Sequence, residues 1–149
     1  RSSMNRKNNF IILLVVLLYF IVPQTGYVWN GPLLGHFIYP FCHANIFHLL
    51  GNCFCLWLFK DTLNYNAWLI AILCSFFPCF IDTPTYGMSG VLFAHIGINW
   101  GRVNGFSTMC RRVLPLTILC GLLPNMNMMI HIYCLFVAYF FTIISRRYA

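Results

Sequence analysis

Apolar runs about as long as a membrane is thick dominate this chain and restrict its fold more than any other feature. Of its 149 residues, 60% are hydrophobic and only 7% are charged, whereas a soluble domain carries about 25% charged residues. A soluble protein of this size could not cover so apolar a surface, while a run of about 20 apolar residues matches the hydrocarbon core of a bilayer. The sequence therefore predicts an all-α integral membrane protein.

We expect six membrane-spanning helices in one domain that covers residues 1–149. Their approximate ranges are 8–26, 41–59, 63–81, 86–102, 110–124 and 126–145. The first run also resembles the core of a signal peptide, because Arg6 and Lys7 precede it, but no small-residue cleavage site follows. We therefore interpret it as an anchored helix. Residues 1–3, ahead of Met4, resemble the remnant of an expression tag and carry no weight in this interpretation.

Two connections are expected to be loops. Residues 26–40 are rich in Gly and Pro, and residues 103–110 form a short link between the fourth and fifth spans. The first loop also carries aromatic residues, whose rings favour the headgroup region of a membrane. These residues are Tyr27, Trp29, Phe37 and Tyr39. We therefore expect this loop to lie in the membrane interface.

Basic residues lie between or beyond the apolar runs and indicate an orientation. With the N-terminus in the cytoplasm, every Lys and Arg falls on the cytoplasmic side, as the positive-inside rule requires. Beyond the N-terminal segment these residues are Lys60, Arg102, Arg111, Arg112, Arg146 and Arg147. Both termini are therefore expected to be cytoplasmic. The net charge of +7 does not indicate a nucleic-acid partner, because no basic cluster is interleaved with aromatic residues.

The eight cysteines do not predict a disulfide framework or a metal site. Most of them lie inside apolar runs, where a buried cysteine usually acts as a small hydrophobic residue. Cys53 and Cys55 are two positions apart and face different sides of a helix, which makes them a poor pair of metal ligands. We expect no metal and no other cofactor.

Three predicted spans carry polar side chains at positions where lipid makes polar groups costly. His48 and Asn52 are four residues apart in the second span and share one helix face. Ser89 lies near the start of the fourth span, and His131 near the start of the sixth. At a rise of 1.5 Å per residue, His48, Ser89 and His131 are expected roughly 5–10 Å below the outer ends of their helices. Three helices would thus bring polar groups to one level.

Small residues form a continuous face on two of these spans. The face of the fourth span consists of Gly90, Ala94, Gly97 and Gly101, and that of the sixth consists of His131, Cys134 and Ala138. Small residues let helices approach closely in membranes, so packing of these faces would bring His131 beside Ser89. A serine hydroxyl is a weak nucleophile until a base takes its proton, and His131 is the candidate base.

No acidic residue is placed to complete a catalytic triad. Asp61 is expected in the cytoplasm, Asp82 in an outer loop, and the chain has no glutamate. A hydrolase would therefore use a Ser–His dyad, with Phe93, one turn after the serine, packed against the imidazole to orient it. The candidate donors to the oxyanion of acyl transfer are His48, Asn52 and the backbone N–H of Ser89.

The other histidines are weaker candidates. His43 is about 140° from His48 on an ideal helix and is expected at the mouth of the second span, nearer the surface. Its structural alternative is a hydrogen bond that holds helices together. His95 is expected to be a satisfied packing residue. His36, in the first loop, is expected to be interfacial.

Together these residues resemble the rhomboid family of intramembrane serine proteases. The pattern consists of His43-x4-His48-x3-Asn52, then Gly87-Met88-Ser89-Gly90, then His131. The resemblance implies a six-helix rhomboid-like bundle in which Ser89 is the nucleophile and His131 the general base. It implies a supporting or oxyanion role for His48, Asn52, His43, Gly87 and Phe93. The chain departs from the family at Phe93, where tyrosine is frequent.

The resemblance also implies an activity and a place. Such a protein cleaves the transmembrane segments of other membrane proteins, and the span over residues 110–124 is the gate through which a substrate enters. Its partners are transmembrane substrates and the lipid bilayer. The size of the chain favours a bacterial inner membrane, with the active site open toward the periplasmic side.

Two alternatives come from other functional classes. The first is a catalytically inactive rhomboid-like protein that binds client transmembrane helices; the intact pair of Ser89 and His131 argues against it. The second is a metal or haem protein, for which no carboxylate is near the candidate ligands. Those ligands would be His43, His48, His131, Met126, Met128 and Met129.

Overall fold

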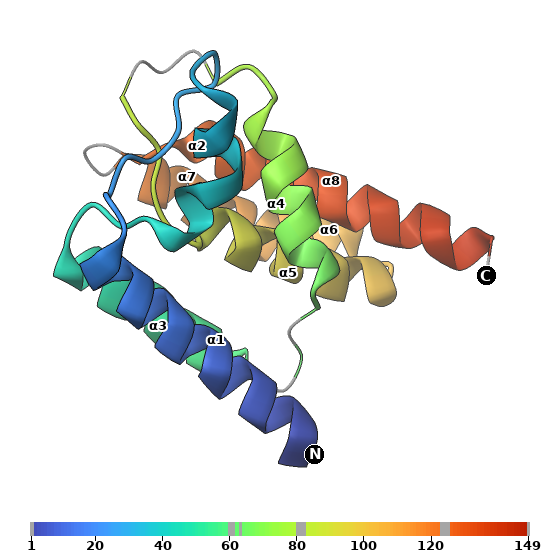
Figure 1. Cartoon of the computed structure of the whole chain (residues 1–149). Coiled ribbons are helices and arrows are strands. Elements are labelled where there is room, and N and C mark those ends of the chain that lie inside the picture. Colours follow the sequence, from blue (N-terminus) through green and yellow to red (C-terminus); the bar gives the residue numbers. More distant parts are fainter. Residues whose placement is uncertain (1, 60–61, 63, 80–82, 123–125, 149) are drawn as a thin grey trace.

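The computed structural model shows a bundle of helices (Figure 1) and describes residues 2–59, 62, 64–79, 83–122 and 126–148. The helices are α1 (Ser2–Ile21), α2 (Leu33–Ile38), the 3-10 helix η1 (Tyr39–Phe41), α3 (Ile46–Leu58), α4 (Asn66–Ser75), α5 (Ser89–Arg102), α6 (Phe106–Arg112), α7 (Leu114–Gly121) and α8 (Met128–Arg147). The described residues contain no β-strand; an isolated bridge pairs Tyr27 with Thr85. The all-α prediction is confirmed.

Helices α5 and α8 pack closely at the centre of the bundle, along the small-residue faces that the sequence indicates. A Cβ atom at Gly97 would collide with the carbonyl oxygen of Leu135, and one at Gly101 would lie 2.8 Å from the Cβ of Thr142. Helix α4 joins this pair around a core of small and branched side chains. Its buried members include Ala67, Ile70, Ala71, Cys74, Val91, Ala94, Ile98, Ile130, Cys134 and Ala138.

The remaining helices cover two sides of this centre. Helices α1 and α3 lie side by side (Figure 1) and share an apolar cluster that reaches the start of α5. Helices α6 and α7 follow one another on the other side, where Met109 of α6 packs with Leu135 of α8. Pro115 lies in the first turn of α7, where its missing N–H costs no helical hydrogen bond.

Residues 26–41 are more ordered than the predicted loop, because they contain α2 and η1. Tyr39 is fully buried; its carbonyl accepts from the Gly87 N–H at 3.0 Å, and its hydroxyl donates to the Ala71 carbonyl at 2.9 Å. Tyr27 is also buried. Both tyrosines therefore pack inside the protein and do not face the membrane, while the location of the loop in the interface stays a prediction. Phe37 does keep an exposed ring.

His36 is likewise buried, contrary to the prediction of an interfacial residue. Its Nδ1 lies 2.9 Å from the hydroxyl oxygen of Ser75, and its ring stacks on Phe76 with centroids 4.3 Å apart. Burial lowers the pKa of His36, so the imidazole is neutral near pH 7. It serves to fix α2 on the end of α4.

Helix length supports fewer spans than the sequence predicts. Among the described residues, α8 alone is long and apolar enough to cross a membrane. The segments Leu33–Phe41 and Ile46–Leu58 would qualify only as a pair, which bends by 72°. Among the described residues, the helices α3, α4, α5 and α7 are shorter than the predicted spans that contain them, and the apolar part of α1 is Asn9–Ile21. Six full-length spans are not seen in this part of the chain, and that arrangement stays a prediction.

Two boundaries differ most from the sequence prediction. The predicted loop 103–110 contains most of α6, and the predicted span 110–124 is broken at Val113 into the end of α6 and the short helix α7. Pro115 explains the break, because a proline is excluded from a helix interior but accepted in a first turn. Pro124, Asp61 and Asp82 lie outside the described residues.

Candidate active site

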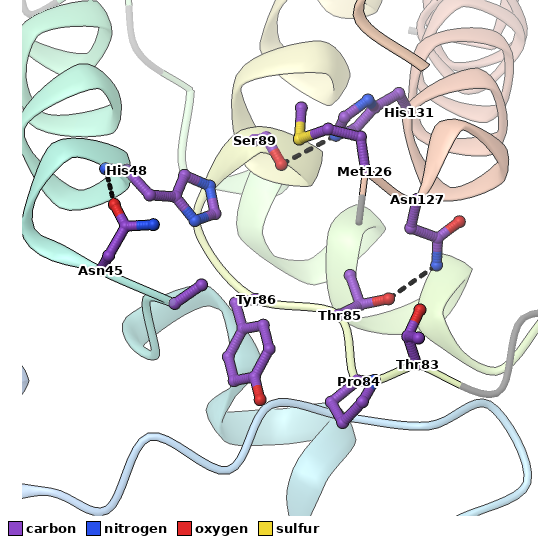
Figure 2. Close-up of a pocket in the computed structure, with 11 residues that line it drawn as sticks. Asn45, His48, Thr83, Pro84, Thr85, Tyr86, Ser89, Met126, Asn127 and His131 are labelled. Carbon is purple, nitrogen blue, oxygen red and sulfur yellow. Dashed lines mark hydrogen bonds between the residues drawn. The ribbon is translucent and has the colours of Figure 1, made fainter. Parts of the chain in front are cut away.

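The structure brings Ser89 and His131 together. Ser89 is the first residue of α5, His131 is the fourth of α8, and the Ser89 Oγ lies 2.8 Å from the His131 Nε2 (Figure 2). This contact confirms the packing that the two small-residue faces predict. The close approach depends on Gly90, where a Cβ atom would lie 2.9 Å from the Tyr39 hydroxyl oxygen and 3.4 Å from the Cys134 sulfur.

The predicted depth of the polar groups is wrong in magnitude. His48, Ser89 and His131 are the third, first and fourth residues of α3, α5 and α8, so they lie within about 5 Å of the helix starts. The reason is that the predicted spans include residues 42–45, 86–88 and 126–127, which precede α3, α5 and α8 and are not helical. The three groups are nevertheless brought together, because His48, Ser89 and His131 line one cavity.

Phe93 supports the imidazole of His131 as expected. The two rings are stacked, with centroids 4.5 Å apart and planes inclined by 19°. His131 is only 2% exposed, and its Nδ1 has no hydrogen-bond partner among the described residues. A neutral imidazole carries one proton, so an Nε2 that accepts from Ser89 leaves that proton on Nδ1. The ring is therefore oriented by stacking and not by an acceptor at Nδ1.

A cavity of about 580 Å³ opens beside the dyad. Figure 2 shows its wall, which comes from the start of α3, residues 83–86, the start of α5 and the start of α8. His48 and Met126 line it together with Ser89 and His131. The cavity is large enough for several residues of a peptide, and the serine hydroxyl faces it.

Gly87 links the dyad to the polar residues of α3. Its φ of +93° is one that side chains rarely adopt, and a Cβ atom there would lie 2.6 Å from Asn52 Nδ2 and 2.8 Å from His48 Nε2. Both polar groups therefore reach the backbone two residues before Ser89. The Asn52 side chain is 6% exposed, and its Nδ2 has no hydrogen-bond partner among the described residues. The Asn52 amide nitrogen is therefore a buried donor that can bind an acceptor on a substrate.

His43 does not lie where helical spacing predicts. Helix α3 begins at Ile46, so His43 precedes it and the 140° separation from His48 does not apply. The His43 ring is fully buried and packs edge-on against that of His48, with centroids 5.3 Å apart. Its backbone N–H donates to the Gln24 side chain at 2.6 Å. His43 is thus part of the histidine cluster and supports His48 directly, although it does not line the cavity.

Sequence reasoning missed two asparagines at this site. Asn45 caps α3 by accepting from the His48 N–H at 2.9 Å, and Asn127 caps α8 by accepting from the Ile130 N–H at 3.2 Å. Asn127 also donates to the Thr85 hydroxyl at 2.7 Å (Figure 2). Each asparagine stands immediately before an apolar run, which is the usual signal of a helix start.

The other candidate ligands are not arranged for a metal. The part of the chain that the structure describes contains no group of three His, Cys, Asp or Glu side chains that could hold an ion. His95 lies near the middle of α5, fully buried, with its Nε2 2.9 Å from the Asn99 Nδ2 and its Nδ1 3.4 Å from the Asn64 backbone nitrogen. It is a satisfied packing residue, as predicted.

The geometry of this site fits acyl transfer by a Ser–His dyad, with buried donors near the serine and room for a substrate. Comparison with protein-family models and with curated proteins finds no match to the chain. The function therefore has to be inferred from the residues of the site and their arrangement.

Proposed function

We propose that this protein is an intramembrane serine endopeptidase of the rhomboid type, which cleaves transmembrane segments of other membrane proteins. The observation that carries the proposal is the 2.8 Å contact between Ser89 Oγ and His131 Nε2 at the wall of the cavity. The proposal includes six membrane crossings, cytoplasmic termini and a site open toward the periplasmic side of a bacterial inner membrane.

The outer surface supports a location in lipid. Large apolar side chains project from it on several helices, for example Phe10 (64% exposed), Phe20 (73%) and Phe47 (81%). Further examples on α4, α7 and α8 include Leu69, Leu73, Leu116, Leu119, Phe140 and Ile144. Soluble monomers rarely expose apolar patches of such extent, whereas lipid tails solvate them at no cost.

Short helices are compatible with membrane crossing where the irregular backbone is protected. Non-helical backbone is tolerated at membrane depth if it is buried in protein or lines a water-filled cavity. Residues 83–86, before α5, line the cavity, and Thr85 pairs with Tyr27 through two backbone hydrogen bonds of 2.8 and 3.0 Å. The first helical turns at the site can therefore be reached by water from one side.

The chemistry follows the positions of the side chains. Ser89 Oγ attacks the carbonyl carbon of the scissile peptide bond, and its proton passes to Nε2 of His131. The resulting oxyanion is stabilised by donors near the serine, for which His48, Asn52 and the Ser89 N–H are the candidates; the N–H of a first helical residue has no helical acceptor. The C–N bond breaks as His131 returns the proton to the leaving amine, and water then hydrolyses the acyl-enzyme.

A fluorophosphonate probe tests this proposal in detergent. The probe forms a bond from phosphorus to an activated serine oxygen and releases fluoride. We expect labelling of the wild type, none of Ser89→Ala and a large loss in His131→Ala. Ser107→Ala serves as the matched control, because Ser107 lies on α6 away from the cavity. Labelling that persists in Ser89→Ala would refute the proposal, and a folded wild type that is never labelled would favour the non-catalytic client-binding alternative.

A further inference from the structure

A second hollow lies at the other end of the bundle from the dyad. It has a volume of about 300 Å³ and is lined by residues from the start of α4 and the ends of α5 and α8. Arg102 is the last residue of α5, which begins with Ser89. At 1.5 Å per residue, the arginine and the serine are about 20 Å apart along the helix. The hollow therefore faces the cytoplasmic side in the proposed orientation.

Two arginines from different helices meet at this hollow. Arg102 and Arg146 both line it, and the Arg146 guanidinium donates a hydrogen bond to the backbone carbonyl of Arg102. This hydrogen bond holds the Arg146 guanidinium beside Arg102. Arg146 also lines an adjoining hollow of about 280 Å³, where it is joined by Arg147.

The positive charge of this region has no carboxylate partner among the described residues. The chain has only two acidic residues, Asp61 and Asp82, and both lie outside the part that the structure describes. The carbonyl ends of α5 and α8 favour cations, but they supply only partial negative charges. Guanidinium groups present several donors and match a phosphate with two parallel hydrogen bonds. An anion is therefore the ligand that these arginines fit.

The remaining lining indicates an amphiphilic anion. Asn64 and Asn66 contribute amide groups to its polar part, while Ile98 and Phe141 contribute apolar side chains. A free inorganic anion would use the polar part alone. A phospholipid would use both, with its phosphate on the arginines and the start of its acyl chains on the apolar side chains.

We propose that this hollow binds the phosphodiester headgroup of an anionic phospholipid, such as phosphatidylglycerol, in the cytoplasmic leaflet. The inference rests on the membrane orientation of the proposed function, but it is independent of Ser89 chemistry. Basic pockets between helices at the cytoplasmic side of a membrane are suited to such headgroups. The site would anchor the ends of α5 and α8, the two helices that carry the dyad at their other ends.

Native mass spectrometry with phosphatidylglycerol added to the purified full chain tests the proposal. The double variant R102Q/R146Q removes both cations of the hollow, and R111Q/R112Q removes two cations of α6 that do not line it. At about 1 kcal/mol for each cation, we expect lipid binding to weaken about 30-fold in R102Q/R146Q. The α6 variant should stay within about threefold of the wild type. Equal losses in the two variants would overturn the proposal.

Further controls distinguish a phospholipid from free phosphate, and a loss of binding from a loss of folding. Inorganic phosphate at millimolar concentration should not displace the lipid; full displacement would assign the hollow to free phosphate and overturn the lipid site. If R102Q/R146Q does not fold, Arg102→Gln alone leaves the contact from Arg146 to the Arg102 carbonyl in place and should still weaken binding. Ser89→Ala should bind the lipid as the wild type does, so a failure of the protease proposal would not affect this result.

Discussion

Replacing Asn127 with alanine should weaken the contact between the helix that carries His131 and the segment that precedes Ser89. The Asn127 side chain is buried and makes three hydrogen bonds: its oxygen caps α8 at the Ile130 N–H, and its amide nitrogen donates to the Thr85 hydroxyl at 2.7 Å and to the Tyr27 hydroxyl at 3.5 Å. Loss of an asparagine cap costs about 1 kcal/mol. Leaving a buried hydroxyl without its partner costs about 1–3 kcal/mol more. We therefore expect Asn127→Ala to lower the free energy of unfolding by about 2–4 kcal/mol.

Asn45→Ala is the matched control for this substitution. Asn45 caps α3 with a single hydrogen bond of similar length, but its side chain is exposed and makes no second contact in the described structure. Its removal should cost about 1 kcal/mol, the value of the cap alone. The measurement is reversible unfolding in mixed micelles, followed by tryptophan fluorescence as the denaturing detergent is increased.

A double-mutant cycle isolates the contact between Asn127 and Thr85. Thr85→Ala and Asn127→Ala are measured separately and together, and their coupling should be about 1 kcal/mol or more because the two side chains share one buried hydrogen bond. Additive effects, or a cost for Asn127→Ala that equals that of Asn45→Ala, would refute the reasoning. The hydrogen bond between Asn127 and Thr85 would then contribute nothing to stability beyond the helix cap.

Two further predictions concern the packing of α5. Gly97→Ala should destabilise the protein by about 1–3 kcal/mol through overpacking against Leu135. Gly51→Ala, whose added methyl group meets no atom within 4 Å, should be neutral or stabilise the protein by up to about 1 kcal/mol. Unfolding in mixed micelles measures both variants, and equal effects would contradict the packing. Phe93→Leu should slow fluorophosphonate labelling about 2- to 13-fold, since a stacked aromatic pair contributes about 0.5–1.5 kcal/mol, while Phe93→Tyr should keep most of the rate. An unchanged rate in Phe93→Leu would show that stacking does not orient His131.

The sequence was sufficient to predict the central contact of the site. Small residues at helical spacing on two segments favoured close packing of α5 on α8 along those faces, and this packing places His131 at Ser89. The stacking of Phe93 followed from its position one turn later. Such predictions succeed because helix periodicity fixes which side chains share a face. The catalytic role of these residues stays a prediction.

The helix boundaries and the surroundings of the site could not be predicted in this way. Apolar runs show which residues avoid water, but they do not distinguish a helix from an irregular segment buried in protein. Residues 41–45 belong to the predicted second span, yet they are not part of α3, and His43 consequently lies against His48 and not around the helix from it. The sequence also does not predict the burial of Tyr39, because its contacts with Gly87 and Ala71 join residues that are far apart in the chain.

The crowding around Gly87 has a consequence for how related chains can vary. Position 87 disfavours a side chain for two reasons: the Asn52 amide and the His48 ring lie where a Cβ atom would be, and its φ of +93° is one that side chains rarely adopt. A homologous chain that carries alanine or a larger residue at position 87 must therefore have a changed turn before Ser89, together with a shorter residue at position 48 or 52 or a shifted α3. Covariation between these three positions would thus record the geometry of the turn before Ser89 in sequences alone, and chains with glycine replaced but both polar residues kept should be absent.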